Sequence, residues 1–167
     1  DYPEKEPSLY VLARRINDFM PTHMFRLTVD ALGRAGVPLK GAKVAMLGWA
    51  FLSNSDDSRN TPSEPFRDAC TRAGGLVAVH DPYVAEYPGV PIVPSIEEAV
   101  KGADAIVIFA GHHQYRALDP KELKLVSGKK HPVIIDGRNM VNPDAYIREG
   151  FVYKGIGRGD RNSHPIL

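Results

Sequence analysis

From Lys43 onward, short apolar runs alternate with amphipathic stretches along the chain. The runs with strand character are Lys43–Leu47, Leu76–His80, Ala105–Phe109 and Val133–Asp136, with weaker ones near Ile92 and at Phe151–Gly155. The stretches with helical character are Pro62–Ala73, Ile96–Val100, Pro120–Val126 and Asn142–Glu149. Runs such as VAML and AIVIF are typical of strands covered on both faces. The alternation predicts an α/β fold, a Rossmann-like doubly wound parallel sheet of about six strands.

A long amphipathic helix is expected ahead of this alternation. Its apolar positions recur at steps of three and four residues: Leu9, Leu12, Ile16, Phe19, Met20, Met24, Leu27 and Ala31. Ser8 can cap its start, Gly36 can end it, and Pro21 predicts a kink or break inside it. The helix fits either a connector or oligomer contact, or packing on its own domain. Residues 1–7 have the polar, proline-broken pattern of a linker or a cut end.

Composition and charge exclude several classes of partner. The 167 residues are 43% hydrophobic and 25% charged, which is ordinary for one globular domain. The net charge of +1 gives no reason to expect nucleic acid or an anionic membrane as a partner. No apolar run approaches the roughly 20 residues of a membrane helix, and no signal peptide is apparent. Cys70 is the single cysteine, so we expect no internal disulfide and a cytoplasmic location.

The turn after the first expected strand lacks the usual dinucleotide fingerprint. A G-x-G-x-x-G turn would let backbone N–H groups approach a pyrophosphate, but only Gly48 of its glycines is present. The bulky Trp49 and Phe51 are expected to obstruct that approach. Asp81, after the second strand, could bind a ribose, but Asp81-Pro82 is also a common turn opener, which we favour.

Two arginines follow strands whose carboxyl ends should share one sheet edge. Arg59 precedes a helix start at Thr61-Pro62-Ser63-Glu64, where threonine can cap and Glu64 can complete a capping box. It could bind phosphate there, or it could pair with Asp56 or Asp57 and brace the loop. Arg138 follows Asp136-Gly137 and should project at the same edge, although it could equally be an ordinary surface residue.

Catalytic and metal-binding patterns are not apparent in the sequence. The adjacent His112 and His113 cannot easily chelate one metal, so we expect solvated loop histidines or one hydrogen bond to a ligand. Cys70 has the helical spacing of a small core residue and not the setting of a reactive thiol. We therefore expect no catalytic residue and no metal site in this chain, and a binding domain that forms part of a larger enzyme.

With these residues in view, the chain resembles the C-terminal part of the UDP-glucose/GDP-mannose dehydrogenase family. The matching pieces run in order along nearly the whole chain: Arg15-Ile16-Asn17-Asp18 with Met20-Pro21, KVAMLGWAF with DDSR and TPS, HDPYV, GADAIVIFAGHHQYRALD, IIDGRNMVNP and YKGIGRG. Each piece alone is weak, but together they are highly specific. Within the family the chain is most similar to the UDP-N-acetylhexosamine type, particularly the UDP-N-acetyl-D-mannosamine dehydrogenases.

The resemblance implies a division of labour. In this family an N-terminal domain binds NAD, a central region carries the catalytic cysteine, and a long helix joins the halves and forms much of a homodimer. The C-terminal domain covers the nucleotide-sugar while the sugar's primary alcohol is oxidised to a carboxylate. By this resemblance, residues 1–38 are the C-terminal part of the joining helix and residues 39–167 are the nucleotide-sugar-binding domain. The NAD-binding and catalytic parts would lie upstream, so the isolated chain is expected to be inactive.

The resemblance also implies roles for three residues. By position, Phe51 and Arg138 would contact the UDP-sugar, and Arg59 would reach the cofactor across the domain cleft. One departure is clear, because Leu52 stands where the family usually has a substrate-binding lysine, and leucine cannot donate to an anion. The alternative is a non-catalytic Rossmann-like binding or interaction module, which Leu52 favours. The sugar, and the choice of UDP or GDP, are left open.

Overall fold

The computed structural model describes residues 8–159 and residue 162, so the proposed linker at residues 1–7 lies outside the described part. Six parallel strands form one sheet in the order β3-β2-β1-β4-β5-β6. In chain order the strands are β1 (Lys43–Leu47), β2 (Leu76–His80), β3 (Ile92–Val93), β4 (Ala105–Ile108), β5 (Val133–Asp136) and β6 (Val152–Gly155). The predicted doubly wound parallel sheet is confirmed.

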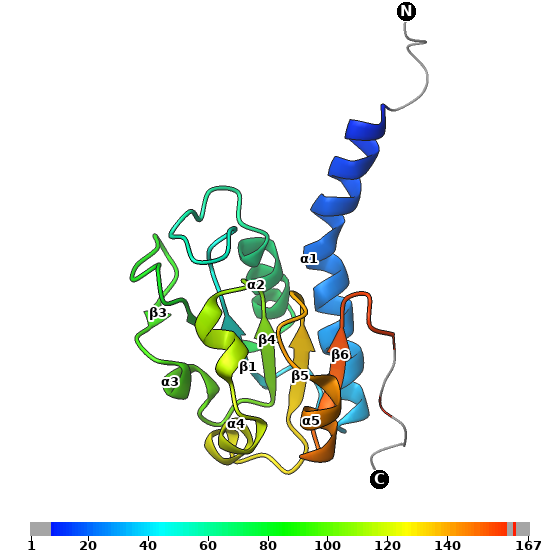
Figure 1. Cartoon of the computed structure of the whole chain (residues 1–167), viewed down its shortest axis with the longest axis vertical. Helices are drawn as coiled ribbons and strands as arrows, with labels where there is room; N and C mark the ends of the chain where they lie inside the picture. Colours follow the sequence, from blue (N-terminus) through cyan, green and yellow to red (C-terminus); the bar gives the residue numbers. More distant parts are fainter. Residues whose placement is uncertain (1–7, 160–161, 163–167) are drawn as a thin grey trace, which may run out of the picture.

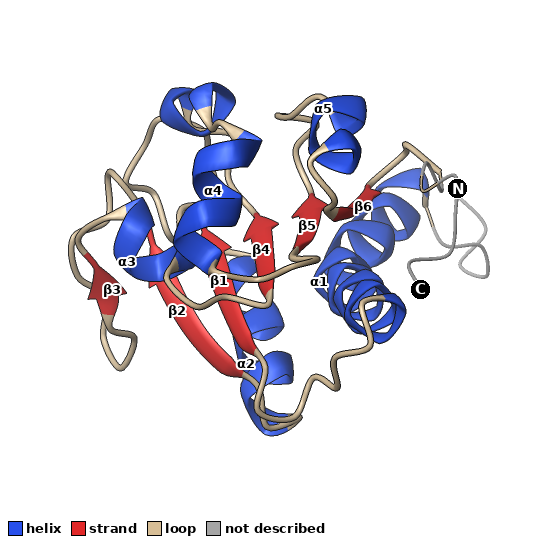
Figure 2. Cartoon of the chain, turned by 90° about the horizontal axis from the view of Figure 1, so that it is seen from below, coloured by secondary structure: helices blue, strands red, loops and turns tan. Residues whose placement is uncertain are grey.

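Helices cover both faces of the sheet (Figure 2). They are α1 (Leu9–Arg34), α2 (Ser63–Arg72), α3 (Ile96–Val100), α4 (Pro120–Ser127) and α5 (Pro143–Arg148), with a 3₁₀ helix, η1, at His113–Ala117. The side chains of each strand alternate between two cores, as the strand geometry requires. Val44 and Met46 join the core beneath α1 and α2, whereas Ala45 and Leu47 join the core beneath α3, α4 and α5.

The long helix α1 is half packed and half exposed. Its C-terminal half contacts α2 and strands β4, β5 and β6, with Met24, Ala31 and Leu32 buried. Its N-terminal half extends beyond the domain, as Figure 1 shows, and leaves Leu9 82% and Ile16 57% exposed. The interpretation as a helix packed on its own domain therefore holds for the C-terminal half, and a connector or oligomer contact stays a prediction for the exposed half.

The structure differs in part from two local expectations, for reasons that lie in tertiary packing. The helix α1 does not break at Pro21, which is buried on the domain; its packing there offsets the backbone hydrogen bond that a proline lacks. Helix α2 begins at Ser63 without a capping box. Instead, the hydroxyl of Thr61 donates to the carbonyl of Trp49 over 2.6 Å and accepts from the N–H of Ser63, so it fastens the helix start to the preceding loop. The expected cap at Ser8 is confirmed, and the side chain of Asn142 caps α5.

Candidate functional site

Two adjoining pockets lie at the carboxyl edge of the sheet, against α1. One has a volume of about 320 Å³ and contains Arg59 with the exposed Arg14–Asp18 pair of α1. The other has a volume of about 170 Å³ and contains Arg138 among mostly apolar side chains. Their shared lining consists of Asn17, Pro21, Phe51 and Pro62. The two arginines predicted to share an edge therefore face neighbouring pockets with a common wall.

Arg59 lies on the surface and is held by one carboxylate. Its side chain is 86% exposed, with Nε 2.9 Å from Oδ1 of Asp57 and Nη2 2.8 Å from Oδ2. The hydrogen bonds from Arg59 hold the pKa of Asp57 at about 2, so the pair is ionised at neutral pH. Of the two partners that the sequence left open, Asp57 is the one the structure pairs with Arg59.

Arg138 stands on a turn that Asp136 organises. Oδ1 of Asp136 accepts the N–H of Arg138 over 3.0 Å, and Oδ2 accepts the N–H groups of Met140 and Val141. The guanidinium of Arg138 is exposed and, among the described residues, has neither a hydrogen bond nor an ion pair. A cation beside an apolar pocket and without a partner within the described chain can accept an anionic ligand without first breaking a bond.

Phe51 separates the two arginines and is 41% exposed. Its backbone N–H donates to the carbonyl of Asp57 over 2.8 Å, which folds the loop back on itself. Leu52, at the position where a lysine was expected from the family, is also on the surface. The loop therefore presents a flat apolar side chain between two cations, an arrangement suited to a ligand with both a ring and negative charges.

Asp81 is a buried carboxylate that joins three loops. Oδ1 accepts the N–H groups of Tyr83 and Val84, which confirms the expected turn. Oδ2 lies 2.7 Å from the N of Trp49 and 3.0 Å from Nε2 of His112. Burial alone would raise the pKa of Asp81, but the hydrogen bonds from His112 and from backbone N–H groups outweigh it and hold the pKa at about 2.

The structure corrects the expectation for the two histidines. His112 is fully buried between the rings of Tyr83 and Tyr115, whereas His113 is exposed. His112 is therefore part of the framework of the site and not a solvated loop residue. The sequence places Asp81 and His112 at one sheet edge, because both follow strands of one parallel sheet, but it does not show that the two side chains bond to each other.

The turn after β1 packs closely against the segment after β4. A Cβ built on Gly48 would lie 2.4 Å from the Cβ of Ala110, so the segment after β4 closes directly over this turn. Trp49 does not obstruct the surface as expected, because its indole is buried in the core against Tyr87. The obstruction at this turn thus comes from Ala110.

Other chemical groups offer little for catalysis. Cys70 is fully buried, which confirms the expected core residue, and this burial raises the pKa of its thiol to about 12. Among the described residues, no three His, Cys, Asp or Glu side chains gather as metal ligands, and no described helix is long and apolar enough to span a membrane.

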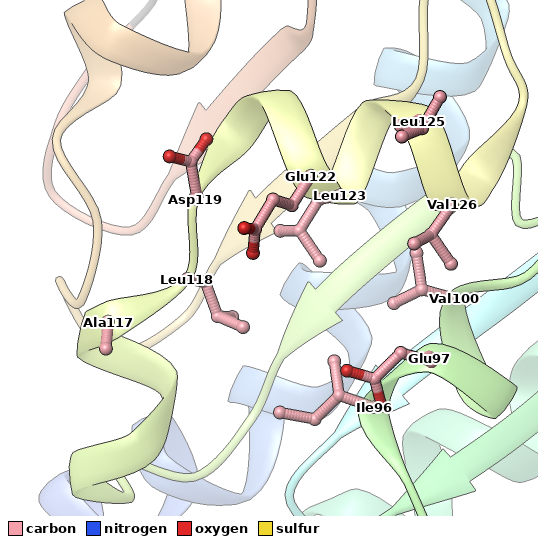
Figure 3. A pocket seen from close by; sticks show the side chains of 10 residues that line it. All are labelled: Ile96, Glu97, Val100, Ala117, Leu118, Asp119, Glu122, Leu123, Leu125 and Val126. Carbon is pink, nitrogen blue, oxygen red and sulfur yellow. The ribbon is translucent and has the colours of Figure 1, made fainter.

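A third pocket, of about 270 Å³, lies away from this edge between α3 and α4. Figure 3 shows its apolar floor and the carboxylates of Glu97, Asp119 and Glu122 at its sides. Asp119 also caps α4 by accepting the N–H of Lys121. The sequence did not single out this pocket, and it did not single out Asn17 and Pro21 as site residues.

Comparison with known proteins assigns the chain to a family. Residues 45–143 match the profile of the UDP-glucose/GDP-mannose dehydrogenase family, UDP binding domain. The chain belongs to this family, and the matched segment is its UDP-binding domain.

Relatives and solved structures agree with this assignment. The chain is 36% identical over 149 residues to UDP-N-acetyl-D-mannosamine dehydrogenase of Pyrococcus horikoshii (89% of this chain, 33% of the relative). It is 35% identical over 150 residues to UDP-glucose 6-dehydrogenase of Rhizobium meliloti (87% and 33%). The structure of NDP-N-acetyl-D-galactosaminuronic acid dehydrogenase from Methanosarcina mazei superposes with a TM-score of 0.94 at 60% identity (98% of this chain, 34% of that chain). The chain thus spans about a third of the length of these proteins.

Proposed function

We propose that this domain binds the UDP-sugar of an NAD-dependent UDP-sugar 6-dehydrogenase. The proposed substrate is UDP-N-acetylmannosamine or a related UDP-hexose, oxidised at C6 to the uronate. The proposed setting is polysaccharide biosynthesis in the cytoplasm. The family assignment supports the nucleotide, and the names of the relatives support this choice of sugar.

The observation that carries the proposal is the pairing of Arg138 with Phe51 around one pocket. Arg138 has no partner among the described side chains, and Phe51 offers an apolar face at the same opening. In this proposal the guanidinium binds anionic oxygens of the substrate by forked hydrogen bonds, which a lysine could not provide in the same geometry. Phe51 packs against an uncharged part of the ligand.

The cofactor is proposed to contact this chain at Arg59. The β1 turn does not fit a pyrophosphate, because Ala110 lies over Gly48. The exposed guanidinium of Arg59 can bind an anion, and it lies in the pocket next to that of Arg138. NAD would accept the hydride when it is bound. A domain outside this chain would provide most of the contacts to NAD. The role left for this domain is to orient the substrate and exclude water.

We further propose that the full-length protein is a homodimer through α1. The part of α1 that leaves the domain carries a row of exposed apolar side chains: Leu9, Leu12, Ile16 and Phe19. Their spacing places them along one helical face, which a second copy can cover. The isolated chain is proposed to be inactive, because its single thiol is buried and its pKa is raised to about 12.

The test is calorimetry of the full-length protein with UDP-glucose, UDP-N-acetylglucosamine, UDP-N-acetylmannosamine and GDP-mannose. Arg138→Ala should weaken binding of the preferred ligand by about 1.5–3 kcal/mol, as expected for a charge-assisted hydrogen bond. The matched control is Arg72→Ala, at the exposed C-terminal end of α2, which should leave binding unchanged. A loss below about 0.5 kcal/mol for Arg138→Ala would refute the contact.

The second candidate function is a non-catalytic binding module, and Leu52 is the observation that favours it. Leucine replaces the cation expected beside Phe51 and cannot bind an anion. Turnover of UDP-sugar with NAD by the full-length protein would exclude this candidate. Production of NADH by the isolated chain would instead refute the proposed division of labour.

A further inference from the structure

A chain of buried and partly buried hydrogen bonds holds the loop after β1 at two points. At the first point, Oδ2 of Asp81 accepts the N–H groups of Trp49 and Ala50 over 2.7 and 2.9 Å. At the second, Nδ1 of His112 accepts the N–H of Asn54 over 2.9 Å. The two points are joined because Nε2 of His112 lies 3.0 Å from the same Oδ2 of Asp81.

The geometry fixes the protonation of His112. Because Nδ1 accepts a backbone N–H, it cannot carry a proton of its own, so Nε2 carries the proton that is donated to Asp81. The geometry therefore assigns the Nε2–H tautomer to His112. The imidazole fits this role because it has one donor and one acceptor on opposite sides of a rigid ring.

Phe51, which separates the two candidate pockets, lies in the sequence between the two points at which the loop is held. Trp49 and Ala50 lie on one side of Phe51, and Asn54 lies on the other. Asn54 has a positive φ of 57° and accepts the N–H of His113 with its side chain, so both its backbone and its side chain are tied to the segment after β4. Phe51 itself has no deep packing to hold it, since it is 41% exposed.

We propose that His112 is a positioning residue for the UDP-sugar site, holding the loop that places Phe51 between Arg59 and Arg138. His112 is buried and does not line either pocket, so it acts through Asn54 and Asp81 and not by touching the ligand. The inference rests on the proposed function for the identity of the ligand. The fastening of the loop rests only on the hydrogen bonds.

Two substitutions separate the two links of His112. In His112→Asn the shorter side chain keeps an acceptor near the Nδ1 position and loses the donor to Asp81. In His112→Gln the longer side chain keeps a donor near the Nε2 position and loses the acceptor for Asn54. The matched control is Tyr115→Phe, because Tyr115 is equally buried and its hydroxyl bonds to His80, yet it has no hydrogen bond to the loop.

The first measurement is hydrogen exchange in residues 50–60 of the full-length protein without ligand. We expect His112→Gln to speed exchange of the Asn54 N–H about tenfold or more, since one hydrogen bond is worth about that factor. His112→Asn should retain that protection, and Tyr115→Phe should leave the loop unchanged. Unchanged exchange in His112→Gln would overturn the proposal.

The second measurement is calorimetry of the same variants with UDP as the probe. We expect His112→Gln to raise Kd about tenfold and Tyr115→Phe to leave it unchanged, even where both variants lower the melting temperature. A Kd that stays at the wild-type value while the loop exchanges faster would overturn the positioning role. Wild-type protein that fails to bind UDP would instead refute the proposed function, while the exchange data would still decide whether the loop is fastened.

A third measurement uses only the wild-type protein, so it does not depend on whether the variants fold. The ¹⁵N spectrum of the histidines in the wild-type protein should show His112 protonated at Nε2 and unprotonated at Nδ1. A proton on Nδ1 would be incompatible with the N–H of Asn54 and would overturn the proposal.

Discussion

Arg59 donates two hydrogen bonds to Asp57, with Nε 2.9 Å from Oδ1 and Nη2 2.8 Å from Oδ2. The pair occupies one edge of the guanidinium, so an incoming phosphate must either use the remaining donors or displace the carboxylate. An exposed pair of this kind is exchanged at little cost, because water screens both charges. Asp57 is therefore a competitor for any anion that Arg59 is to bind.

If NAD contacts Arg59 as proposed, this competition predicts opposite effects for two substitutions in the full-length protein. Arg59→Ala should raise KM for NAD about tenfold or more, because a charge-assisted hydrogen bond is lost. Asp57→Asn should lower KM for NAD, because the competing negative charge is removed while the backbone bond to Phe51 is kept. Steady-state kinetics with varied NAD measures both. An increase in KM for Asp57→Asn as large as that for Arg59→Ala would show that the pair, and not the free arginine, is required.

Gly48 is expected to be indispensable for stability. Its φ of 104° disfavours other residues, and an added Cβ would lie 2.4 Å from the Cβ of Ala110. Gly48→Ala should lower the free energy of unfolding by about 4 kcal/mol, since strain in φ and overpacking add. Gly89→Ala is the control, because Gly89 has a φ of 72° but nothing near its missing Cβ.

Urea unfolding of the two variants measures the difference. The free energy of unfolding of the control, Gly89→Ala, should fall by about 1–2 kcal/mol, which is the cost of a positive φ at a residue with a Cβ. Equal losses in the two variants would contradict the close approach of Ala110 to the β1 turn.

The strands could be predicted because each is a short apolar run bounded by turn residues. Lys43–Leu47 and Val133–Asp136 were predicted with their observed bounds. The shared edge of Arg59 and Arg138 followed from topology alone, because parallel strands bring their carboxyl ends together. The roles proposed for these residues stay predictions.

Several features could not be predicted because they depend on long-range contacts. The 3₁₀ helix at His113–Ala117 has no hydrophobic period to show it. Asp81 and His112 are 31 positions apart, and their hydrogen bond exists only after β2 and β4 are placed in one sheet. Likewise, the spacing of the loop did not distinguish Asp56 from Asp57 as the partner of Arg59.

Asp81 should make the stability of the domain depend on pH in the acid range. Its pKa is about 2 in the fold against 3.8 for the unperturbed group. Because the folded pKa is the lower one, the stabilisation is full above pH 4 and is lost as the pH falls towards 2. The loss should be about 2 kcal/mol, because the pKa differs by about 1.8 and a pKa difference of 1 corresponds to about 1.36 kcal/mol.

Urea unfolding between pH 2 and pH 7 measures this contribution. Asp81→Asn should be less stable than wild type at pH 7, and the gap should narrow at pH 2. The control, Asp18→Asn, alters an exposed carboxylate of α1 and should keep the wild-type slope. A gap for Asp81→Asn that is constant with pH would show that the carboxylate does not carry this dependence.

The exposed half of α1 predicts that the full-length protein self-associates through this helix. Ile16 lies in the middle of the apolar row and is 57% exposed in the single chain, although soluble proteins seldom leave such a row uncovered. If a second copy covers it, Ile16→Glu buries an unpaired carboxylate in the contact and should abolish the dimer at micromolar concentration. Leu125→Glu is the matched control, because Leu125 is 82% exposed on α4, on the other face of the sheet, and should leave the dimer intact. Sedimentation velocity of both variants decides the matter: a dimer that survives Ile16→Glu would mean that this face of α1 packs against some other part of the protein.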